Sequence, residues 1–247
     1  MWCAGSGSPT VVLESALGQD TANWFKIGPQ VAAQTRLCAY TRAGIGGSEP
    51  AGASPRTSSD VAADLHTLLH TAGIQPPYVL VGHSVGGWHT QVFTSAYREE
   101  VAGLVLVDSL HPDQAQRQLE ALPPEALDEP EGLRKFRLNL SAFMETPALN
   151  TENLNLAASA EQVRAAGSLG DLPLAVVTAN QSNAPDLPEE VAAALHAVWL
   201  ELQDELASLS SNSRHTFATE GGHFVQLDQP EVVIEAIVYV LEAAREP

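Results

Sequence analysis

The chain has 247 residues, 45% of them hydrophobic, which is enough for one sizeable domain with a large buried core. Its 30 acidic residues outnumber 12 basic ones, and the net charge of −18 argues against nucleic acid or an anionic membrane surface as a partner, since phosphate binding needs clustered Lys and Arg. It contains no apolar run long enough to span a membrane, so we expect a soluble protein without membrane partners.

Short apolar segments alternate with helix-compatible segments along most of the chain. In the segment 58–72, Val61, Leu65 and Leu69 recur at four-residue spacing, which is typical of a helix with one buried face. Strand–helix alternation with continuous apolar strands predicts an α/β fold with a mostly parallel sheet covered on both faces. We expect strands at 9–13, 36–40, 78–81, 104–108, 174–178 and 214–218, and helices at 21–35, 58–72 and 84–97.

The segment 78–87 is an apolar strand that ends in Gly-His-Ser-Val-Gly, and helix-compatible sequence follows it. In this context Gly-x-Ser-x-Gly is typical of a nucleophile elbow, in which the serine sits on a tight strand-to-helix turn. Glycines two residues to either side of Ser84 avoid clashes in the strained turn. The elbow presents the Ser84 hydroxyl at the carboxyl edge of the sheet. It also points the Val85 N–H, at the helix start, to where an oxyanion would form.

A serine nucleophile needs a histidine base and a group that orients that histidine. His223 lies in a Gly-rich segment between the candidate strand 214–218 and a helix start. At that helix start we expect Asp228 as N-cap and Glu231 as its capping-box partner. We therefore take His223 as the candidate base. Other histidines fit structural roles. His66, His70 and His196 are expected on helices, His215 in a strand, and His83 packed inside the elbow.

Between residues 111 and 171 the strand–helix alternation stops. This Pro- and Glu-rich segment has helical stretches at 115–122, 131–145 and 159–166, and we expect it to form a cap. The division predicts an α/β core of residues 1–110 and 172–247 with a helical cap, residues 111–171, inserted into it. The candidates to line a substrate pocket under the cap are Phe136, Leu140, Phe143, Met144 and Leu149.

Together, these motifs resemble the α/β-hydrolase superfamily, and the resemblance covers nearly the whole chain. The segment from Cys38 to Ser48 resembles the family's Asp-Arg-x-Gly-x-Gly-x-Ser loop after the fourth strand, with Thr41 in place of the aspartate. The resemblance implies a fold shortened at its N-terminus. Segment 9–13 would be the family's third strand, residues 1–3 a remnant of the second, and the first would be missing.

The resemblance also implies a triad acid after the seventh strand or, in some branches, after the sixth. Asp108 ends the sixth strand, 24 residues after Ser84. After the seventh strand, Asn183 stands near the usual position, but an amide cannot stabilise an imidazolium as an anion does. Asp186 lies further along the same loop. We assign Asp108 as the acid, with Asp186 as the alternative.

The family supplies a second oxyanion donor from the loop after its third strand, usually His-Gly-x-Pro-Gly. Here that loop reads Glu-Ser-Ala-Leu-Gly, at residues 14–18. Aligning the final glycine makes the Ala16 N–H the donor beside that of Val85, and a shift of one residue makes it Leu17. Glu14 is either a buried, hydrogen-bonded carboxylate or an exposed one.

The two cysteines bear on the compartment. The family's sheet order places the second strand beside the fourth, so Cys3 and Cys38 could be neighbours. A disulfide between them would imply an oxidising, extracytoplasmic compartment, whereas two buried thiols are the alternative. No signal peptide is visible, which makes the cytoplasm the default.

The resemblance implies a carboxylesterase-like serine hydrolase that cleaves small to medium, largely apolar esters through an acyl-enzyme. A lactonase, amidase or perhydrolase using the same site is an alternative, as is a non-catalytic protein that holds a small ligand under the cap. We assign no residues as metal ligands from their spacing, and we expect neither a metal nor a cofactor. The expected partner is a small-molecule ester, and the oligomeric state stays open.

Overall fold

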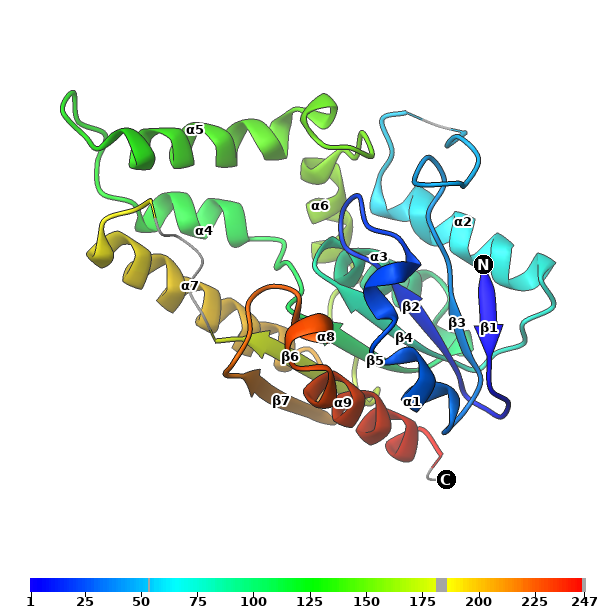
Figure 1. Cartoon of the computed structure of the whole chain (residues 1–247). Helices are drawn as coiled ribbons and strands as arrows, with labels where there is room; N and C mark the ends of the chain where they lie inside the picture. The colour runs from blue at the N-terminus through cyan, green and yellow to red at the C-terminus, as the bar shows by residue number, and fades with distance from the viewer. Residues whose placement is uncertain (53, 181–185, 246–247) are drawn as a thin grey trace.

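The computed structural model describes residues 1–52, 54–180 and 186–245 (Figure 1). Within these residues a seven-stranded sheet has the order β1-β3-β2-β4-β5-β6-β7. Its described neighbouring strands are parallel apart from β1 and β3, which pair antiparallel. The strands are β1 (Trp2–Ala4), β2 (Thr10–Glu14), β3 (Leu37–Ala39), β4 (Tyr78–His83), β5 (Val101–Val107), β6 (Leu174–Ala179) and β7 (Ser213–Ala218).

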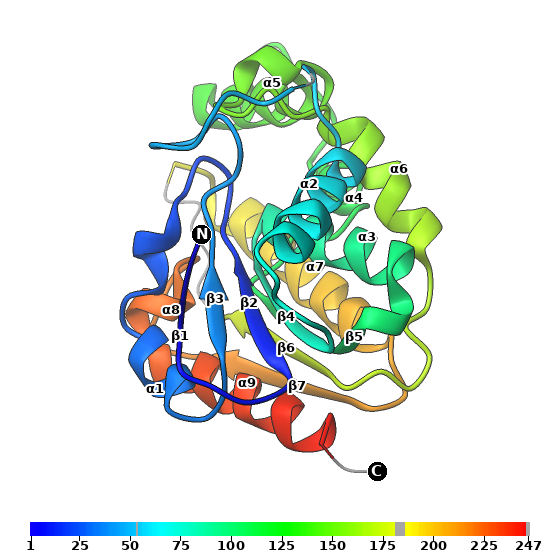
Figure 2. The same cartoon turned by 90° about the vertical axis from the view of Figure 1, so that its right-hand side faces the viewer.

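Helices cover both faces of the sheet, as Figure 2 shows. One face carries α1 (Gly28–Ala32) and α9 (Pro230–Ala243), and the other carries α2 (Ser58–Thr71), α3 (Val85–Ala96) and α7 (Glu189–Ala207). This arrangement confirms the predicted α/β fold. No helix in the described part of the chain is long and apolar enough to cross a membrane. The other helical elements are η1 (Thr21–Trp24), η2 (Arg98–Glu100), η3 (Pro147–Leu149), α4 (Gln114–Ala121), α5 (Glu131–Glu145), α6 (Leu156–Ala166) and α8 (Val225–Asp228).

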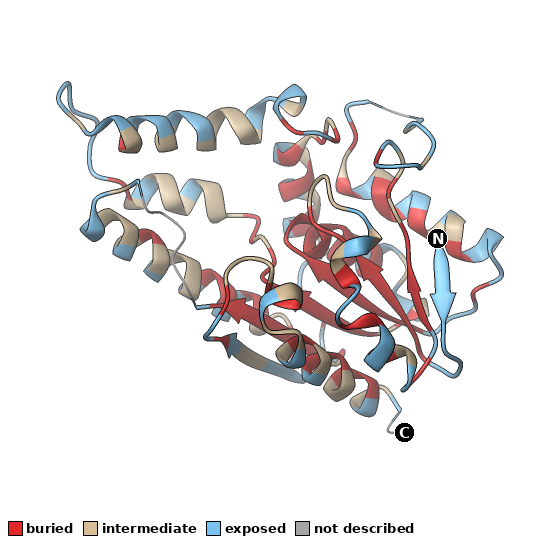
Figure 3. Ribbon diagram, viewed as in Figure 1, coloured by how far each residue is buried: buried red, intermediate tan, exposed pale blue. Residues whose placement is uncertain are grey.

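Alternate side chains of each strand pack against opposite helical layers. In β2, Val11 and Leu13 belong to the core shared with α1 and α9, whereas Val12 belongs to the core shared with α2 and α3. Strands β2, β4 and β6 are buried along their whole length (Figure 3). Because water reaches neither face of these strands, their sequences read as continuous apolar runs, with no polar side to alternate.

Two of the expected helix boundaries are wrong. Segment 21–35 forms η1 and then α1, because Pro29 fits only the first turn of a helix. Asp228 is not an N-cap, since it is the last residue of α8 and α9 begins at Pro230. The Asp228 carboxylate instead accepts a hydrogen bond from the N–H of Gly222 at 2.9 Å. It therefore orders the loop that carries the candidate base.

The helices between β5 and β6 pack in two different places. Leu122, which follows α4, and Leu133 of α5 form a small apolar cluster with Leu195 of α7. In contrast, α6 contributes Leu156 and Val163 to the core beside α2 and α3. Within the expected cap, α4 and α5 form a layer that extends away from the sheet (Figure 1), and α6 packs as part of the core.

A disulfide joins β1 to β3. Cys3 and Cys38 stand opposite each other in the register of the two strands, and their sulfur atoms are bonded. Strand β1 is exposed along its length, so its own burial contributes little to holding it on the sheet. The disulfide fastens this edge strand covalently.

Replacing Cys3 by serine should lower the free energy of unfolding by about 4 kcal/mol, because the cross-link spans 35 residues and its loss frees the unfolded chain. Equilibrium unfolding in urea measures the difference. Reductant should weaken the wild type by the same amount and leave the Cys3→Ser variant unchanged. Equal stability of the oxidised wild type and the variant would contradict this expectation.

Candidate active site

Ser84 sits on a strained turn between β4 and α3. Its backbone has φ 57° and ψ −124°, in the half of conformational space that favours glycine. A Cβ on Gly82 would lie 2.6 Å from the carbonyl oxygen of Gly86, and a Cβ on Gly86 would lie 2.6 Å from that of Glu14. The two glycines of Gly-x-Ser-x-Gly therefore let β4, α3 and the loop after β2 approach one another around Ser84.

His223 and Asp108 come from different strand ends and meet beside the elbow. Asp108 directly follows β5, and His223 lies in the loop between β7 and α8. The Nδ1 of His223 lies 2.6 Å from Oδ2 of Asp108. The other oxygen, Oδ1, accepts a hydrogen bond from the N–H of Ala179 at 2.8 Å, which orients the carboxylate. With Nδ1 engaged, Nε2 is the ring nitrogen left to exchange a proton with a hydroxyl.

Asp108 is a buried carboxylate, 3% exposed. Burial raises the pKa of Asp108, against the opposing effect of its hydrogen bond and charge interaction with His223. The buried carboxylate is placed to stabilise a positive charge on the imidazole, while the His223 side chain, 37% exposed, remains accessible from solvent.

The alternative acid, Asp186, lies elsewhere. It is exposed, and its carbonyl oxygen lies against the first turn of α5, where a Cβ on Gly132 would approach it to 2.4 Å. The structure thus places Asp108, rather than Asp186, at the candidate base. Asn183 lies outside the described residues.

His83, the neighbour of Ser84, positions the histidine loop. Its Nε2 lies 2.7 Å from the carbonyl oxygen of His223, and its Nδ1 lies 3.1 Å from the amide nitrogen of Gln226. Nε2 must donate to the carbonyl, so Nδ1 accepts from the amide and the ring is neutral. Burial, with the nearby His223, lowers the pKa of His83 to about 3. His83 therefore packs and orients, and it does not exchange protons near neutral pH.

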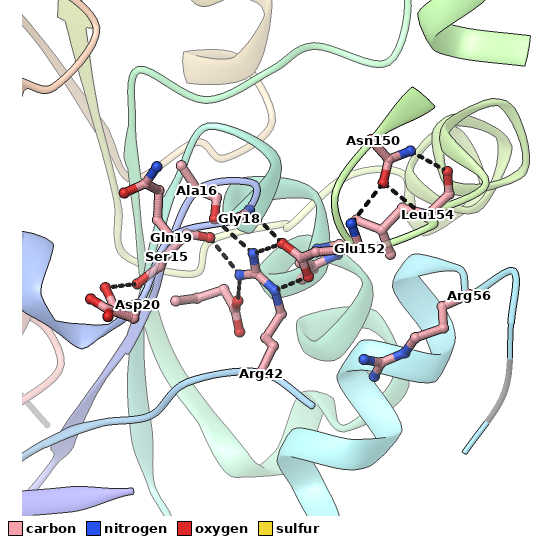
Figure 4. Close-up of polar contacts among 12 residues, drawn as sticks. Ser15, Ala16, Gly18, Gln19, Asp20, Arg42, Arg56, Asn150, Glu152 and Leu154 are labelled. Carbon is pink, nitrogen blue, oxygen red and sulfur yellow. Dashed lines mark hydrogen bonds and ion pairs between the residues drawn. The ribbon is translucent and has the colours of Figure 1, made fainter. Parts of the chain in front are cut away.

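Arg42 holds the loop after β2 (Figure 4). Its guanidinium donates hydrogen bonds to the carbonyl oxygens of Ser15 at 2.6 Å and Ala16 at 2.7 Å. It also forms ion pairs with the carboxylates of Glu14 and Glu152, the latter bidentate, with Nε lying 2.7 Å from Oε2. These contacts use all five N–H donors of the guanidinium. A planar group with every donor engaged leaves the loop little freedom.

Glu152 extends this contact to the segment between η3 and α6. The Oδ1 of Asn150 accepts a hydrogen bond from the N–H of Leu154 at 2.9 Å, closing the turn that presents Glu152. Glu152 in turn accepts a hydrogen bond from the N–H of Gly18 at 2.7 Å. One carboxylate therefore joins Arg42, just after β3, to the end of the loop 14–18.

The charges of this network are buried. Glu14 is inaccessible to solvent, which decides between the two environments expected for it. Burial raises the pKa of Glu14, and the charge of Arg42 and the hydrogen bond from the Tyr40 hydroxyl act against that rise. For Arg42, burial alone would lower the pKa, but the carboxylates of Glu14 and Glu152 outweigh it and raise the pKa. Arg42 therefore stays charged.

The network also orients the two candidate oxyanion donors. The carbonyl and the N–H of one trans peptide unit point in opposite directions. Because Arg42 binds the Ser15 carbonyl, it turns the Ala16 N–H away from the guanidinium. Its bond to the Ala16 carbonyl does the same for the N–H of Leu17, whose side chain packs against the core beside α2 and α3.

A small apolar cavity of about 110 Å³ lies beside the elbow. The N–H of Leu110, in its wall, donates a hydrogen bond to the carbonyl oxygen of Ser84 at 3.3 Å, and Trp88 lies one turn along α3 from Ser84. The cavity is lined by Trp88, Leu110, His111, Gln114, Ala115, Leu140, Phe143 and Met144. Leu140, Phe143 and Met144, three of the residues expected to line a pocket, line this cavity, whereas Ser84, His223 and Asp108 are not among its lining residues.

Phe136 and Leu149 do not reach that cavity. Phe136 packs against the cluster of Leu122, Leu133 and Leu195, and Leu149 is 60% exposed. Phe136 lies on the same face of α5 as Phe143 but two turns, about 10 Å, further from the elbow. Both residues border a second hollow of about 410 Å³, which shares Leu140 and Phe143 with the first.

Comparison with known proteins shows the family to which the chain belongs. A family model described as "alpha/beta hydrolase fold" matches residues 9–198, which is most of the chain. The chain belongs to the α/β-hydrolase family. The matched residues include Ser84 and the strands from β2 to β6, and the loop that carries His223 lies beyond them.

Two curated relatives show how far the similarity extends. The chain is 28% identical over 240 residues to YqjL of Bacillus subtilis (strain 168), an alignment that covers 97% of this chain and 86% of YqjL. It is 27% identical over 278 residues to the "Probable transporter efuK" of Hormonema carpetanum, covering 96% of this chain and 40% of that protein. The chain therefore spans most of one relative and less than half of the other.

Solved structures share the fold at low sequence identity. A thermophilic esterase from Thermogutta terrifontis has a TM-score of 0.63 and 21% identity, with 99% of this chain and 93% of the esterase covered. Est816, described as "an N-Acyl homoserine lactone degrading enzyme", has a TM-score of 0.59 and 16% identity, with coverage of 96% and 94%. At these identities the similarity establishes the fold alone.

Sequence analysis missed Arg42, Glu152 and the role of His83. Arg42 could have been noticed from its place in the segment that resembles the family's Asp-Arg-x-Gly loop, just beyond the end of a strand. A cation that is buried at such a position needs counter-charges. No local signal pairs Glu152 with it, because 110 residues separate the two.

Replacing Arg42 by methionine should lower the free energy of unfolding at pH 7 by about 3–5 kcal/mol, because two buried carboxylates lose their counter-charge. The deficit should shrink from pH 8 to pH 5. Burial already raises the pKa of Glu14, and losing Arg42 raises it further, so protonation at lower pH removes the unpaired charge.

The control is Arg42→Lys, which keeps the charge but offers three N–H donors in place of five and should lose less stability. Urea unfolding at several pH values measures both variants. A deficit in Arg42→Met that does not vary with pH would contradict the charged network.

Proposed function

We propose that the protein is a serine hydrolase that cleaves carboxylic esters through an acyl-enzyme on Ser84. The observation that carries this proposal is the strained elbow of Ser84 together with a histidine whose Nδ1 lies 2.6 Å from a buried carboxylate. Such a pair leaves one imidazole nitrogen free to act as a base beside the nucleophile. Membership in the α/β-hydrolase family supports a hydrolytic reaction.

In the proposed reaction, His223 takes the proton of the Ser84 hydroxyl at Nε2 as the oxygen attacks the ester carbonyl. Asp108 keeps the proton on Nδ1 and stabilises the imidazolium. The imidazolium then protonates the departing alcohol as the ester C–O bond breaks. Water next attacks the acyl-enzyme and gives its proton to His223, and the Ser84 oxygen leaves the acyl group and regains a proton.

The N–H groups of Val85 and Ala16 are the proposed donors to the oxyanion. Val85 is the first residue of α3, so its N–H belongs to the helix turn that has no partner inside the helix, at the positive end of the dipole. The Ala16 N–H points away from Arg42, because Arg42 binds the Ser15 carbonyl of the same peptide unit. Donors set in advance stabilise a developing charge without reorganisation.

The size of the cavity supports a substrate with a short apolar group. A volume of about 110 Å³ corresponds to roughly four water-sized groups. Its wall is mostly apolar, with His111 and Gln114 as polar members beside Trp88, Leu140, Phe143 and Met144. We therefore expect p-nitrophenyl acetate and butyrate to be cleaved faster than long-chain esters.

Replacing Ser84 by alanine should reduce hydrolysis of p-nitrophenyl butyrate by about 10³-fold or more, because the nucleophile is lost. The same change should abolish labelling by a fluorophosphonate, which reacts with activated serines. The midpoint of thermal unfolding should change little, and Ser59→Ala, on the exposed face of α2, is the matched control. Wild-type protein that is neither labelled nor active would favour the non-catalytic, ligand-binding alternative.

Replacing Asp108 by asparagine should lower kcat by about 10³–10⁴-fold with little change in KM, because the imidazolium loses its stabilising charge. Asp186→Asn makes the same chemical change at an exposed position and should retain nearly full activity. Steady-state kinetics of both variants on one short ester decides between them. A larger loss in Asp186→Asn would show that Asp108 is not the acid.

A further inference from the structure

Three potential metal ligands gather at the end of α3 opposite to Ser84. His66 and His70 lie four residues apart on α2, and Glu100 ends η2, directly before β5 begins. Since α3 separates Tyr97 from Ser84 by its full length of about 18 Å, this group lies far from the proposed catalytic residues. The expectation that the chain lacks metal-ligand spacing is wrong, because His66 and His70 have the His-x-x-x-His spacing that puts two imidazoles on one helix face.

The distances among these groups suit a tetrahedral ion. Nε2 of His66 lies 3.1 Å from Oε1 of Glu100, and Nε2 of His70 lies 3.2 Å from both carboxylate oxygens. Ligands at the usual Zn–N and Zn–O distances of about 2.0–2.1 Å stand roughly 3.3 Å apart at the corners of a tetrahedron. An ion could therefore enter between these atoms with small side-chain movements. Without an ion, the imidazole nitrogens and the carboxylate oxygens are close enough to form hydrogen bonds with one another.

The ligands are both held and accessible. The ring of His66 stacks on that of Tyr97, with centroids 3.8 Å apart and planes 6° from parallel. The side chains of His66, His70 and Glu100 are 25%, 48% and 22% exposed, so an ion can enter from solvent. Partial exposure also leaves room for water to complete the coordination.

We propose that His66, His70 and Glu100 bind one divalent transition-metal ion, with Zn²⁺ the best match. Two imidazoles and one carboxylate form a donor set that Zn²⁺ accepts with water as fourth ligand. Mg²⁺ and Ca²⁺ prefer sets made entirely of oxygen ligands. The ion would tie α2 to the connection between α3 and β5, so its binding stabilises the folded chain.

Isothermal titration of tag-free protein, first freed of metal with a chelator, tests the proposal. We expect the wild type to bind one Zn²⁺ per chain and no Mg²⁺. The variants His70→Ala and Glu100→Gln should each bind Zn²⁺ at least about 10–100-fold more weakly. His196→Ala, on α7, removes a histidine elsewhere and should bind as the wild type does.

Thermal unfolding provides a second measurement that is independent of hydrolysis. Zn²⁺ should raise the unfolding midpoint of the wild type and of Ser84→Ala equally, and that of His70→Ala much less, because the ion binds only the folded site. Absence of Zn²⁺ binding by the wild type would overturn the proposal. So would equal affinity in the wild type, His70→Ala and Glu100→Gln.

Discussion

The edge of the sheet that carries the candidate active site depends on the buried charge of Arg42. A guanidinium moved out of water is costly unless it is paired and fully hydrogen-bonded. Glu14, Glu152 and two carbonyl oxygens of the loop 14–18 supply that compensation. Because one rigid, planar group satisfies all of them at once, the loop cannot move without leaving a buried charge unpaired. The segment between η3 and α6, which carries Glu152, and the loop 14–18 are therefore held together.

Backbone strain at the candidate nucleophile is offset by the regular structure on either side. Ser84 and Asp108 both have positive φ, at 57° and 42°. Yet the N–H of Ser84 donates to the Val107 carbonyl at 3.1 Å, and that of Asp108 donates to the Val177 carbonyl at 2.7 Å. The hydrogen bonding of the sheet thus continues past the last strand residues and holds both turns. This arrangement presents a hydroxyl and a carboxylate from adjacent strand ends.

Different groups of polar side chains lie at the two ends of the parallel strands. Residues that follow β4, β5 and β7 converge at the carboxyl edge, where α/β sheets usually bind ligands. The cap helices α4 and α5 add the apolar wall of the small cavity there. At the amino edge, Glu100 meets His66 and His70, which belong to a helix connected to β4. The length of α3 keeps these two groups apart.

Local patterns of the sequence determined the strands, the helices around them, the elbow serine and the histidine loop. Each of these depends on neighbours within a few residues, such as the glycines that the turn at Ser84 requires. Only the tertiary structure decided that Asp108 rather than Asp186 meets His223, that Arg42 binds Glu152, and that Glu100 lies between two histidines. These pairs are 115, 110 and about 30 residues apart in the chain, and no periodicity encodes them. Charged and polar groups find partners according to how layers pack, and that packing is a property of the whole fold.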